Sequence, residues 1–323
     1  MSVLVYLEHG ADGVDEPSLQ ALTLARSLGR PSVEAVVACN SLLQALPDAL
    51  GGHGVERLHV AEREVFESHA PLAIAEAIVE LARRIGATAV VGPGTERGNE
   101  VLAHVAALTD QPLAANCVAA SLAEGGAAVT RVRWGGSLLE EARVDGSPVL
   151  LTVQPHAVAI EETGGDAPAA EAFQPTLSET AQATRVVERV GESGGGISLA
   201  DAKVVVSAGR GAGSPEGFAG VEELAALLGG AVGCSRAVTM AGWRPHTDQV
   251  GQTGTKIAPD LYVACGISGA TQHMAGCKGA KRILAINKDP GAPIMSIADY
   301  AVIGDLHDIL PAISAEIRRV RGA

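Results

Sequence analysis

Residues 249–287 contain two short apolar segments, Leu261–Cys265 and residues 282–286, separated by a glycine-rich turn and a helical stretch. Gly266 and Gly269 permit a sharp turn because they carry no Cβ atom. The arrangement predicts a strand, a tight turn, a helix and a second strand. Strands joined through a helix run parallel, and parallel sheets are covered by helices. This stretch therefore predicts a layered α/β fold.

The turn after Leu261–Cys265 also has the features of an anion site. Ser268 is well placed to cap a helix that begins around Ala270. The first N–H groups of a helix have no internal partner and lie at its positive end, where a pyrophosphate often binds. Such turns also serve packing alone, so this one by itself leaves both a nucleotide-binding and a purely structural role open.

Apolar strands alternate with amphipathic helices through the first third of the chain. Strands are predicted at 3–7, 33–38, 55–60 and 88–91, and helices at 18–28, 41–50, 71–85 and 98–108. Pro71 suits the first turn of its helix and Gly86 suits its end. This alternation predicts a mainly parallel, doubly wound sheet.

The pattern changes after Asp110. Strand-like segments at 113–121, 127–133, 138–144 and 149–153 predict a meander attached to the first sheet. Residues 161–175 are polar, aperiodic and rich in Gly, Pro and Ala, which predicts a loop. One more strand is predicted at 184–190, and the run GESGGG at 191–196 is the best hinge candidate.

A second α/β unit is predicted beyond the hinge. Its strands are expected at 203–207, 231–233, 261–265, 282–286 and 300–303, with a helix at 218–228 and an amphipathic terminal helix to about Val320. The 323 residues suffice for two domains. We expect an α/β domain at 1–190 that serves as a partner-binding scaffold, a hinge at 191–197, and a Rossmann-like domain at 198–323.

The composition limits the classes of partner. Aromatic residues make up 2% of the chain, which argues against base-stacking platforms, and the net charge of -13 opposes binding to nucleic acid or anionic membranes. We see no membrane span and no secretory signal in residues 1–13. The five cysteines are scattered, so we expect reduced thiols and no metal site in a cytoplasmic protein.

Polar residues recur at the carboxyl ends of the C-terminal strands. These residues are Arg210, Ser235, Arg236, Ser268, Asn287 and Asp305. In an open parallel sheet the ligand crevice lies at that edge. Five strands that each end in polar residues therefore indicate one site.

Several segments of this second half resemble one known family, in order and at fitting spacings. They are SAGRGAG (207–213), GCSRAVTMAGW (233–243), QVGQTGTKIAPDLYVACGISGATQH (249–273), AINKDPGAPI (285–294) and ADYAVIGDL (298–306). They resemble the α subunit of electron transfer flavoprotein. Thr271 departs from the pattern, because the family more often has an aliphatic residue there. The N-terminal half agrees in length and α/β character but carries no signature of its own.

The resemblance implies a carrier rather than an enzyme with its own substrate chemistry. The family binds one FAD non-covalently in the C-terminal domain and forms a heterodimer with a β subunit, which commonly holds AMP. It accepts electrons from acyl-CoA and other dehydrogenases, as in fatty acid β-oxidation, and passes them to a quinone oxidoreductase or a related acceptor.

The resemblance also assigns the site residue by residue. Arg236, after Ser235, would lie by the flavin ring, and Thr253 would donate its hydroxyl to flavin N5. Arg210 would counter the phosphates. The remaining candidates are Gln249, Val250, Gly251, Gln252 and Gly254 in the first turn, Gly266, Ser268, Gly269, Ala270, Thr271, Gln272 and His273 in the second, and Asn287, Lys288, Asp305 and Leu306 at the adenosine end.

Other interpretations stay open at this point. The chain could be a stand-alone NAD- or FAD-binding enzyme, although no base or nucleophile accompanies the site, or a structural partner that has lost its cofactor. The run Gly92-Pro93-Gly94-Thr95 could be a second nucleotide turn, but no basic residue of the P-loop type follows it. Glu140-Glu141 and Glu161-Glu162 fit solvated faces better than paired catalytic carboxylates, and Cys265 and Cys277 fit packing roles.

Overall fold

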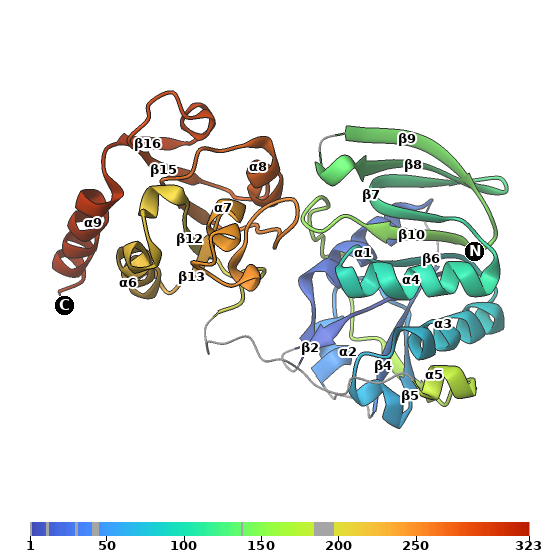
Figure 1. Ribbon diagram of the computed structural model, residues 1–323. Helices are drawn as coiled ribbons and strands as arrows, with labels where there is room; N and C mark the ends of the chain where they lie inside the picture. Colours follow the sequence, from blue (N-terminus) through green and yellow to red (C-terminus); the bar gives the residue numbers. More distant parts are fainter. Residues whose placement is uncertain are drawn as a thin grey trace. The chain divides into compact units, whose positions relative to one another are not determined.

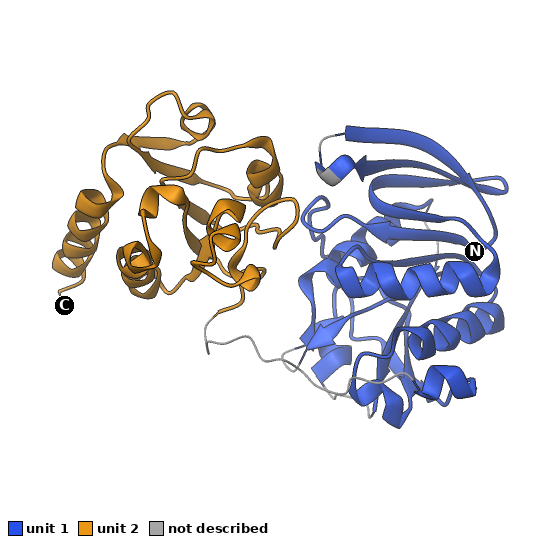
Figure 2. Cartoon of the chain, viewed as in Figure 1, with its two compact units in different colours: residues 1–189 blue, residues 190–323 orange. Residues whose placement is uncertain are grey.

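The computed structural model describes residues 2–10, 13–29, 32–40, 45–136, 138–183 and 197–322. The chain divides into two compact units, Met1–Arg189 and Val190–Ala323, which are described separately below (Figures 1 and 2). The strand predicted at 184–190 and the hinge candidate at 191–196 lie outside the described residues.

The first unit is built on a nine-stranded sheet in the order β11-β5-β4-β1-β6-β10-β7-β8-β9. The strands are β1 (Ser2–Tyr6), β4 (Ser32–Cys39), β5 (Arg57–Glu62), β6 (Ala87–Pro93), β7 (Leu113–Ala123), β8 (Gly126–Arg133), β9 (Leu138–Asp145), β10 (Val149–Val153) and β11 (Ala169–Phe173). The pairings from β11 to β7 are parallel, and β7, β8 and β9 pair antiparallel. A two-stranded hairpin, β2 (His9–Gly10) and β3 (Gly13–Val14), was not foreseen.

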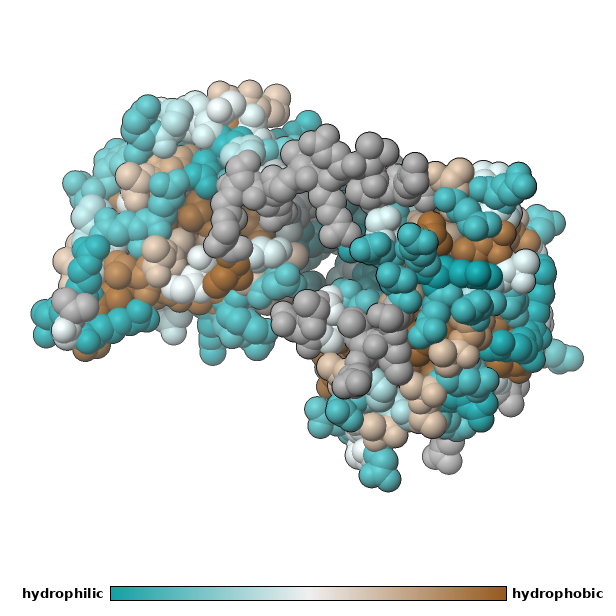
Figure 3. Space-filling view, turned by 90° about the horizontal axis from the view of Figure 1, so that it is seen from below, coloured by the Kyte–Doolittle hydropathy of each residue, from teal (hydrophilic) through white to brown (hydrophobic). Residues whose placement is uncertain are grey.

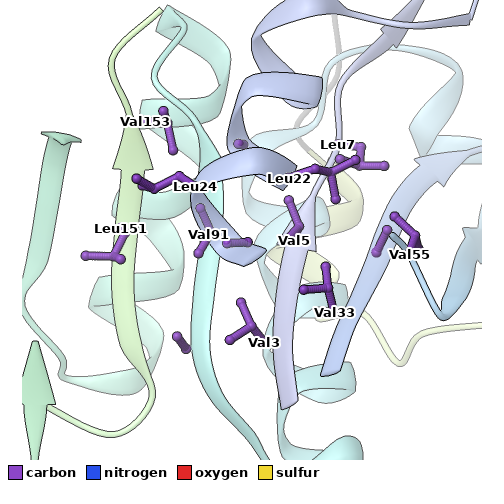
Figure 4. Close-up of a cluster of buried hydrophobic side chains, with 14 of the residues drawn as sticks. Val3, Val5, Leu7, Leu22, Leu24, Val33, Val55, Val91, Leu151 and Val153 are labelled. Carbon is purple, nitrogen blue, oxygen red and sulfur yellow. The ribbon is translucent and has the colours of Figure 1, made fainter. Parts of the chain in front are cut away.

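Helices cover both faces of this sheet. They are α1 (Glu16–Ser27), α2 (Ala45–Ala49), α3 (Pro71–Ile85), α4 (Glu96–Thr109) and α5 (Glu179–Ala183), with short 3₁₀ turns at Glu64–Glu67 and Trp134–Gly136. Along β1, Val3 and Val5 pack with Leu22 of α1 on one face (Figure 4), whereas Leu4 packs with Ile78 of α3 on the other. Alternate side chains along the strands therefore pack into two cores, one on each face of the sheet, as a doubly wound sheet requires.

Helix α3 shows how closely local signals matched the structure. It begins with Pro71 in its first turn and ends at Gly86, whose φ of 65° is left-handed. The amide of Gly86 donates back to the carbonyls of Ala82 and Arg83, a cap that glycine adopts without the strain of a Cβ atom. The predicted bounds of this helix are confirmed.

Two expectations for the first unit are wrong. Val149–Val153 is not part of the meander, because it inserts between β6 and β7 and pairs parallel with both. The predicted loop at 161–175 contains β11, which pairs parallel with β5 at the sheet edge. Four of the five β11 residues are exposed, so the strand lacks the apolar alternation by which a sequence reveals a half-buried strand.

The second unit has a five-stranded parallel sheet in the order β13-β12-β14-β15-β16. Its strands are β12 (Val204–Ala208), β13 (Ala231–Cys234), β14 (Leu261–Cys265), β15 (Ile283–Asn287) and β16 (Tyr300–Ile303). The chain moves outward in one direction from β12 to β13 and in the other direction from β14 onward. Sheets with this order have a crevice at the carboxyl ends of the two strands that flank the reversal, here β12 and β14.

Both faces of the second sheet are also covered. The helices are α6 (Ala219–Leu228), α7 (Arg236–Met240), α8 (Thr271–Cys277) and α9 (Leu306–Arg321), with 3₁₀ turns at Arg210–Ala212, Pro215–Phe218, His246–Asp248 and Pro293–Ser296. Leu224 of α6, Val238 of α7 and Leu310 of α9 share one core. Cys277 of α8 packs with Ile294 in the other. The predicted fold class, two α/β domains on mainly parallel doubly wound sheets, is confirmed.

Much of the face in Figure 3 is hydrophilic, with apolar patches between the polar areas. Among the described helices, none is both long and apolar enough to cross a bilayer.

Candidate ligand-binding cleft

A cleft of about 350 Å³ lies at the carboxyl ends of the strands of the second sheet. Ten residues singled out from the sequence line it: Arg210, Ser235, Arg236, Gly266, Ser268, His273, Asn287, Lys288, Asp305 and Leu306. They come from turns after all five strands of the sheet. The structure thus brings the polar strand ends together at one edge, as the sequence pattern predicted.

Two glycine turns approach each other by backbone alone at the reversal point. The amide of Gly209 donates to the carbonyl of Cys265 at 2.9 Å, and the amide of Gly211 donates to the carbonyl of Gly266 at 3.2 Å. A Cβ atom on Gly211 would lie 2.6 Å from the Cα atom of Gly266. Real Cβ atoms do not lie so close to a backbone atom, so glycine is required at this position. Backbone atoms alone therefore line this part of the cleft, and the two turns are called the glycine cradle below.

Arg210 and Arg236 supply positive charge to the cleft, and no described residue neutralises it. Both residues are exposed and line the cleft, and neither side chain forms an ion pair or hydrogen bond with any residue in the described part of the chain. Unpaired guanidinium groups beside a backbone cradle favour an anionic ligand, because they bind phosphate with charge-assisted hydrogen bonds.

At the far side of the cleft, Lys288 and Asp305 form an ion pair. Lys288 Nζ lies 2.6 Å from Asp305 Oδ2, while Asp305 Oδ1 accepts from the amide of His307 at 3.0 Å and caps α9. The hydrogen bond from Lys288 holds the pKa of Asp305 below its usual value. The carboxylate therefore stays charged at neutral pH and offers acceptor oxygens beside the cleft.

Asn287 ties two neighbouring turns together. Its Nδ2 atom donates to the carbonyl of Ile267 at 2.9 Å, and its Oδ1 atom accepts from the amide of Asp289 at 3.0 Å. These bonds link the end of β15 to the turn after β14. Asn287 therefore holds the cleft wall in shape.

His273 is a neutral, nearly buried residue of the cleft. It is 7% exposed, and its Nε2 atom lies 2.7 Å from the hydroxyl of the buried Tyr262. Burial lowers the pKa of His273 to about 4. The imidazole is therefore uncharged at neutral pH and provides one donor and one acceptor nitrogen.

The expectation that Ser268 caps the following helix is wrong. Helix α8 begins at Thr271, its N-cap position is Ala270, and no side chain caps it. Gly269 has a φ of 80°, and a Cβ atom there would lie 2.6 Å from Ile294. Because the turn packs against Ile294, the helix begins later than the sequence predicted. Ser268 is therefore too far from the start of the helix to cap it, and it lines the cleft instead.

The other ten candidates do not line the cleft; four of them are buried and six are at least partly exposed. The ten are Gln249, Val250, Gly251, Gln252, Thr253, Gly254, Gly269, Ala270, Thr271 and Gln272. The amide of Gln252 donates to the carbonyl of Gln272 at 2.7 Å, which docks the first turn on α8. A Cβ atom on Gly276 would lie 2.3 Å from the amide nitrogen of Gly251, so glycine permits this contact.

Gln249 is a buried residue whose side chain holds that turn in place through hydrogen bonds. It is 2% exposed, its Nε2 atom donates to Thr253 Oγ1 at 3.0 Å, and its Oε1 atom accepts from Thr239 Oγ1 at 2.7 Å. Thr253 itself is exposed. The hydroxyl of Thr253 is therefore held in one place on the surface with its own proton still available to a ligand.

Sequence reasoning missed some of the lining. Gly209, Gly211, Ala237, Ile267, Ile286, Asp289, Ala292 and Gly304 also line the cleft. Most are immediate neighbours of the polar strand ends, which is the signal that could have identified them. It also missed that Arg236 opens a short helix, α7.

The glycine turn considered as a second nucleotide site lies at the reversal point of the first sheet, after β6. Its polar groups have partners within the chain. Thr95 Oγ1 accepts from the amide of Gly98 at the start of α4 and donates to the Glu8 carboxylate at 2.8 Å. The amide of Gly94 donates to the carbonyl of Val153 at 2.8 Å. These contacts support a structural role for the turn.

Comparison with known proteins decides the family. The model of the electron transfer flavoprotein domain matches residues 3–184, and that of the electron transfer flavoprotein FAD-binding domain matches residues 198–278. The electron transfer flavoprotein subunit alpha of Mycobacterium tuberculosis is 36% identical over 320 residues, 99% of each chain. The chain belongs to the electron transfer flavoprotein α-subunit family.

Relatives from other bacteria agree. The electron transfer flavoprotein subunit alpha of Syntrophomonas wolfei is 34% identical over 98% of each chain, and the protein FixB of Clostridium saccharobutylicum is 34% identical over 85% of this chain and 83% of its own. The match to residues 3–184 extends the family to the first unit, where the sequence showed no signature.

The second unit of this electron transfer flavoprotein subunit fits a flavin dinucleotide. Its glycine cradle leaves backbone room for a pyrophosphate, and Arg210 and Arg236 offer positive charge that is not paired with any residue the structure describes. At about 350 Å³ the cleft is at the small end of ligand sites, so it suits one part of an extended dinucleotide while the rest lies along the adjoining surface.

Proposed function

We propose that this chain binds one FAD non-covalently in its second unit and works as the electron-carrying subunit of a heterodimer. Electrons would come from dehydrogenases, such as acyl-CoA dehydrogenases in fatty acid β-oxidation, and pass to a quinone oxidoreductase or a related acceptor in the cytoplasm. The observation that carries the proposal is the cleft at the carboxyl ends of the strands, where a glycine cradle meets two arginines that have no partner among the described residues.

The pyrophosphate would lie over the glycine turns. Gly211 and Gly266 allow close approach of the ligand to the backbone, and Arg210 and Ser268 supply a cation and a hydroxyl on the cleft wall. Arginine presents several donors in one plane, which matches phosphate oxygens. These residues would bind and orient the cofactor without taking part in electron transfer.

The adenosine end would lie toward Asn287, Lys288, Asp305 and Leu306. The Asp305 carboxylate has acceptor oxygens for ribose hydroxyls, and Leu306 is a mostly buried apolar contact. A carboxylate that accepts from the ribose is a common device in dinucleotide sites. Asn287 would keep this wall rigid through its bonds to Ile267 and Asp289.

The flavin ring would lie by Arg236 and the turn around Thr253. FAD stores and releases electrons when it is bound, and the protein tunes how readily it does so. The Arg236 guanidinium would favour the negative charge that reduction places on the ring, with Ser235 beside it. Thr253 would donate to N5, and Gln272 and His273 would contact the pyrimidine side of the ring.

The exposure of this region supports the proposal of a partner subunit. Gln252, Thr253, Thr271 and Gln272 are all exposed in the chain by itself. A ring bound there would remain open to water on one side. A β subunit, with AMP as its own nucleotide, would cover the ring, and the first unit would serve as a scaffold for that partner.

The proposal is tested by co-expressing the chain with the β subunit encoded by its host. We expect a yellow complex that releases one FAD per heterodimer on acid denaturation and is reduced by an acyl-CoA dehydrogenase with its substrate. A colourless complex that stays colourless after FAD is added would refute the proposal. Calorimetric titration with NAD, AMP and FAD then separates the carrier from a stand-alone NAD-dependent enzyme, which would bind NAD.

A further inference from the structure

Thr253 lies on a short closed turn, residues 249–255, which is called the Thr253 turn below. The two ends of the turn are joined by a hydrogen bond, in which the amide of Thr255 donates to the carbonyl of Gln249 at 2.7 Å. The backbone of Gln249 also forms a bridge with Cys234 at the end of β13. Thr253 itself is exposed. The position of its hydroxyl therefore depends on what holds the turn.

The side chain of Gln249 connects the Thr253 turn to helix α7. Its amide group reaches two hydroxyls, Thr253 Oγ1 at 3.0 Å and Thr239 Oγ1, on α7, at 2.7 Å. No other described residue forms a hydrogen bond with this side chain. A hydroxyl both donates and accepts, so the two contacts persist whichever way the amide is turned. The link between turn and helix therefore does not depend on the direction of either bond.

Helix α7 also carries Arg236, which the proposed function places beside the same ring as Thr253. Arg236 is the first residue of the helix. The Thr239 hydroxyl lies 3.0 Å from the Arg236 carbonyl and 2.7 Å from the Gln249 amide oxygen. A buried amide that loses a partner is destabilised, so this set of contacts restrains the turn relative to the helix.

We propose that Gln249 is a positioning residue that fixes Thr253 relative to Arg236, and so sets where these two side chains meet the ring of the cofactor. The inference deepens the proposed function and rests on it for the identity of that cofactor. Gln249 would not touch the cofactor, because it is buried and does not line the cleft. A glutamine that only stabilised the core would act on folding, and its effect would not pass through Thr253.

The first test uses the flavin-free full-length chain. The amide of Gln252 donates to the carbonyl of Gln272 at 2.7 Å, so its hydrogen-exchange rate, measured by NMR, reports how firmly the Thr253 turn is docked. Gln249→Met keeps a side chain of similar length without its hydrogen bonds, and it should speed this exchange about fivefold, the effect of one hydrogen bond. Gln20→Met is the matched control. Gln20 is 4% exposed and accepts from the amide of His156 in the first unit, so this change should leave the rate unaltered.

The second test is FAD binding by the heterodimer. Gln249→Met and Thr253→Val should each weaken binding about fivefold. In the Thr253→Val background, Gln249→Met should cost less than about a further twofold, because its effect passes through the Thr253 hydroxyl. Fully additive losses would overturn the positioning role, since they would show that Gln249 acts on the fold as a whole.

Unchanged exchange at Gln252, or wild-type FAD affinity, in a folded Gln249→Met variant would also overturn the inference. Thr239→Val removes only the contact on α7 and should change both readouts in the same direction. It decides the question if Gln249→Met does not fold, because wild-type values in Thr239→Val would exclude the link to α7. If the heterodimer binds no FAD, the proposed function fails, whereas the exchange rates still decide whether Gln249 holds the turn.

Discussion

The amide of Gly211 donates to the carbonyl of Gly266 across the reversal point of the second sheet, with nitrogen and oxygen 3.2 Å apart. Gly266 has a φ of 59°, and a Cβ atom on it would lie 2.6 Å from the Cα atom of Gly211. The ends of β12 and β14 can therefore approach only through their backbones. This approach shapes the floor of the cleft and leads to the first prediction.

Gly266→Ala should destabilise the second unit by about 1–3 kcal/mol, because the new methyl group forces the two turns apart in a left-handed backbone position. It should also reduce the FAD retained by the heterodimer. Urea unfolding and the flavin-to-protein absorbance ratio measure the two effects. Gly220→Ala on α6 is the control, since its Cβ atom would make an ordinary contact of 3.5 Å with Leu310. Equal stability of the two variants would contradict the crowding argument.

Arg210→Gln and Arg236→Gln should differ in what they change. Arg210→Gln should weaken FAD binding roughly tenfold or more, since it removes a charge-assisted contact to phosphate. Arg236→Gln should instead lower the reduction potential of the bound flavin, because less positive charge faces the reduced ring. Fluorescence titration and spectroelectrochemistry separate the two readouts. Arg319→Gln, on α9 and paired with Glu316, controls for net charge. A normal flavin potential in Arg236→Gln would exclude its role at the ring.

Asp305→Asn should weaken binding of FAD but not of riboflavin, which lacks the adenosine half. The change removes the ion pair with Lys288 and one strong acceptor for ribose, so we expect roughly a fivefold loss. Competition titrations with FAD and riboflavin give the ratio. Asp260→Asn, which breaks an exposed ion pair with Lys281, is a matched control. Equal losses for both ligands would place Asp305 away from the adenosine end.

Glu8 should make the first unit less stable as the pH rises. Burial is the main reason that the pKa of Glu8 is raised from 4.5 to about 7, with the hydrogen bond from Thr95 acting in the opposite direction. Between these values the folded chain binds more protons than the unfolded chain, so the free energy of unfolding falls with rising pH. The shift corresponds to about 3 kcal/mol at most.

Glu8→Gln should remove that dependence and stabilise the chain at pH 8, because the amide keeps an oxygen for Thr95 without a buried charge. Urea unfolding from pH 5 to pH 8 measures it, with the exposed Glu179→Gln as a control. The same slope in wild type and Glu8→Gln would show that another group titrates.

The elements that local patterns identified are those with strong chemical signals. Leu261–Cys265 and Pro71–Ile85 have the bounds that their apolar pattern and their Pro and Gly signals predicted. Strand β11 was not predicted, because four of its residues are exposed and it lacks an alternating apolar pattern. Ser268 does not cap α8, because the packing of Gly269 against Ile294 moves the start of the helix to Thr271. Contacts between distant residues decided both failures, and no local pattern encodes them.

The amino-acid sequence by itself determined the α/β class, the glycine turns, and the polar residues at the strand ends, since each depends on a local property of the chain. Only the tertiary structure decided the strand order that brings β12 beside β14, and hence which turns share the cleft. It also decided that Arg210 and Arg236 lack partners in the described chain while Lys288 is paired with Asp305. Pairing and burial depend on residues far apart in sequence. The charge available to a ligand is therefore a property of the fold.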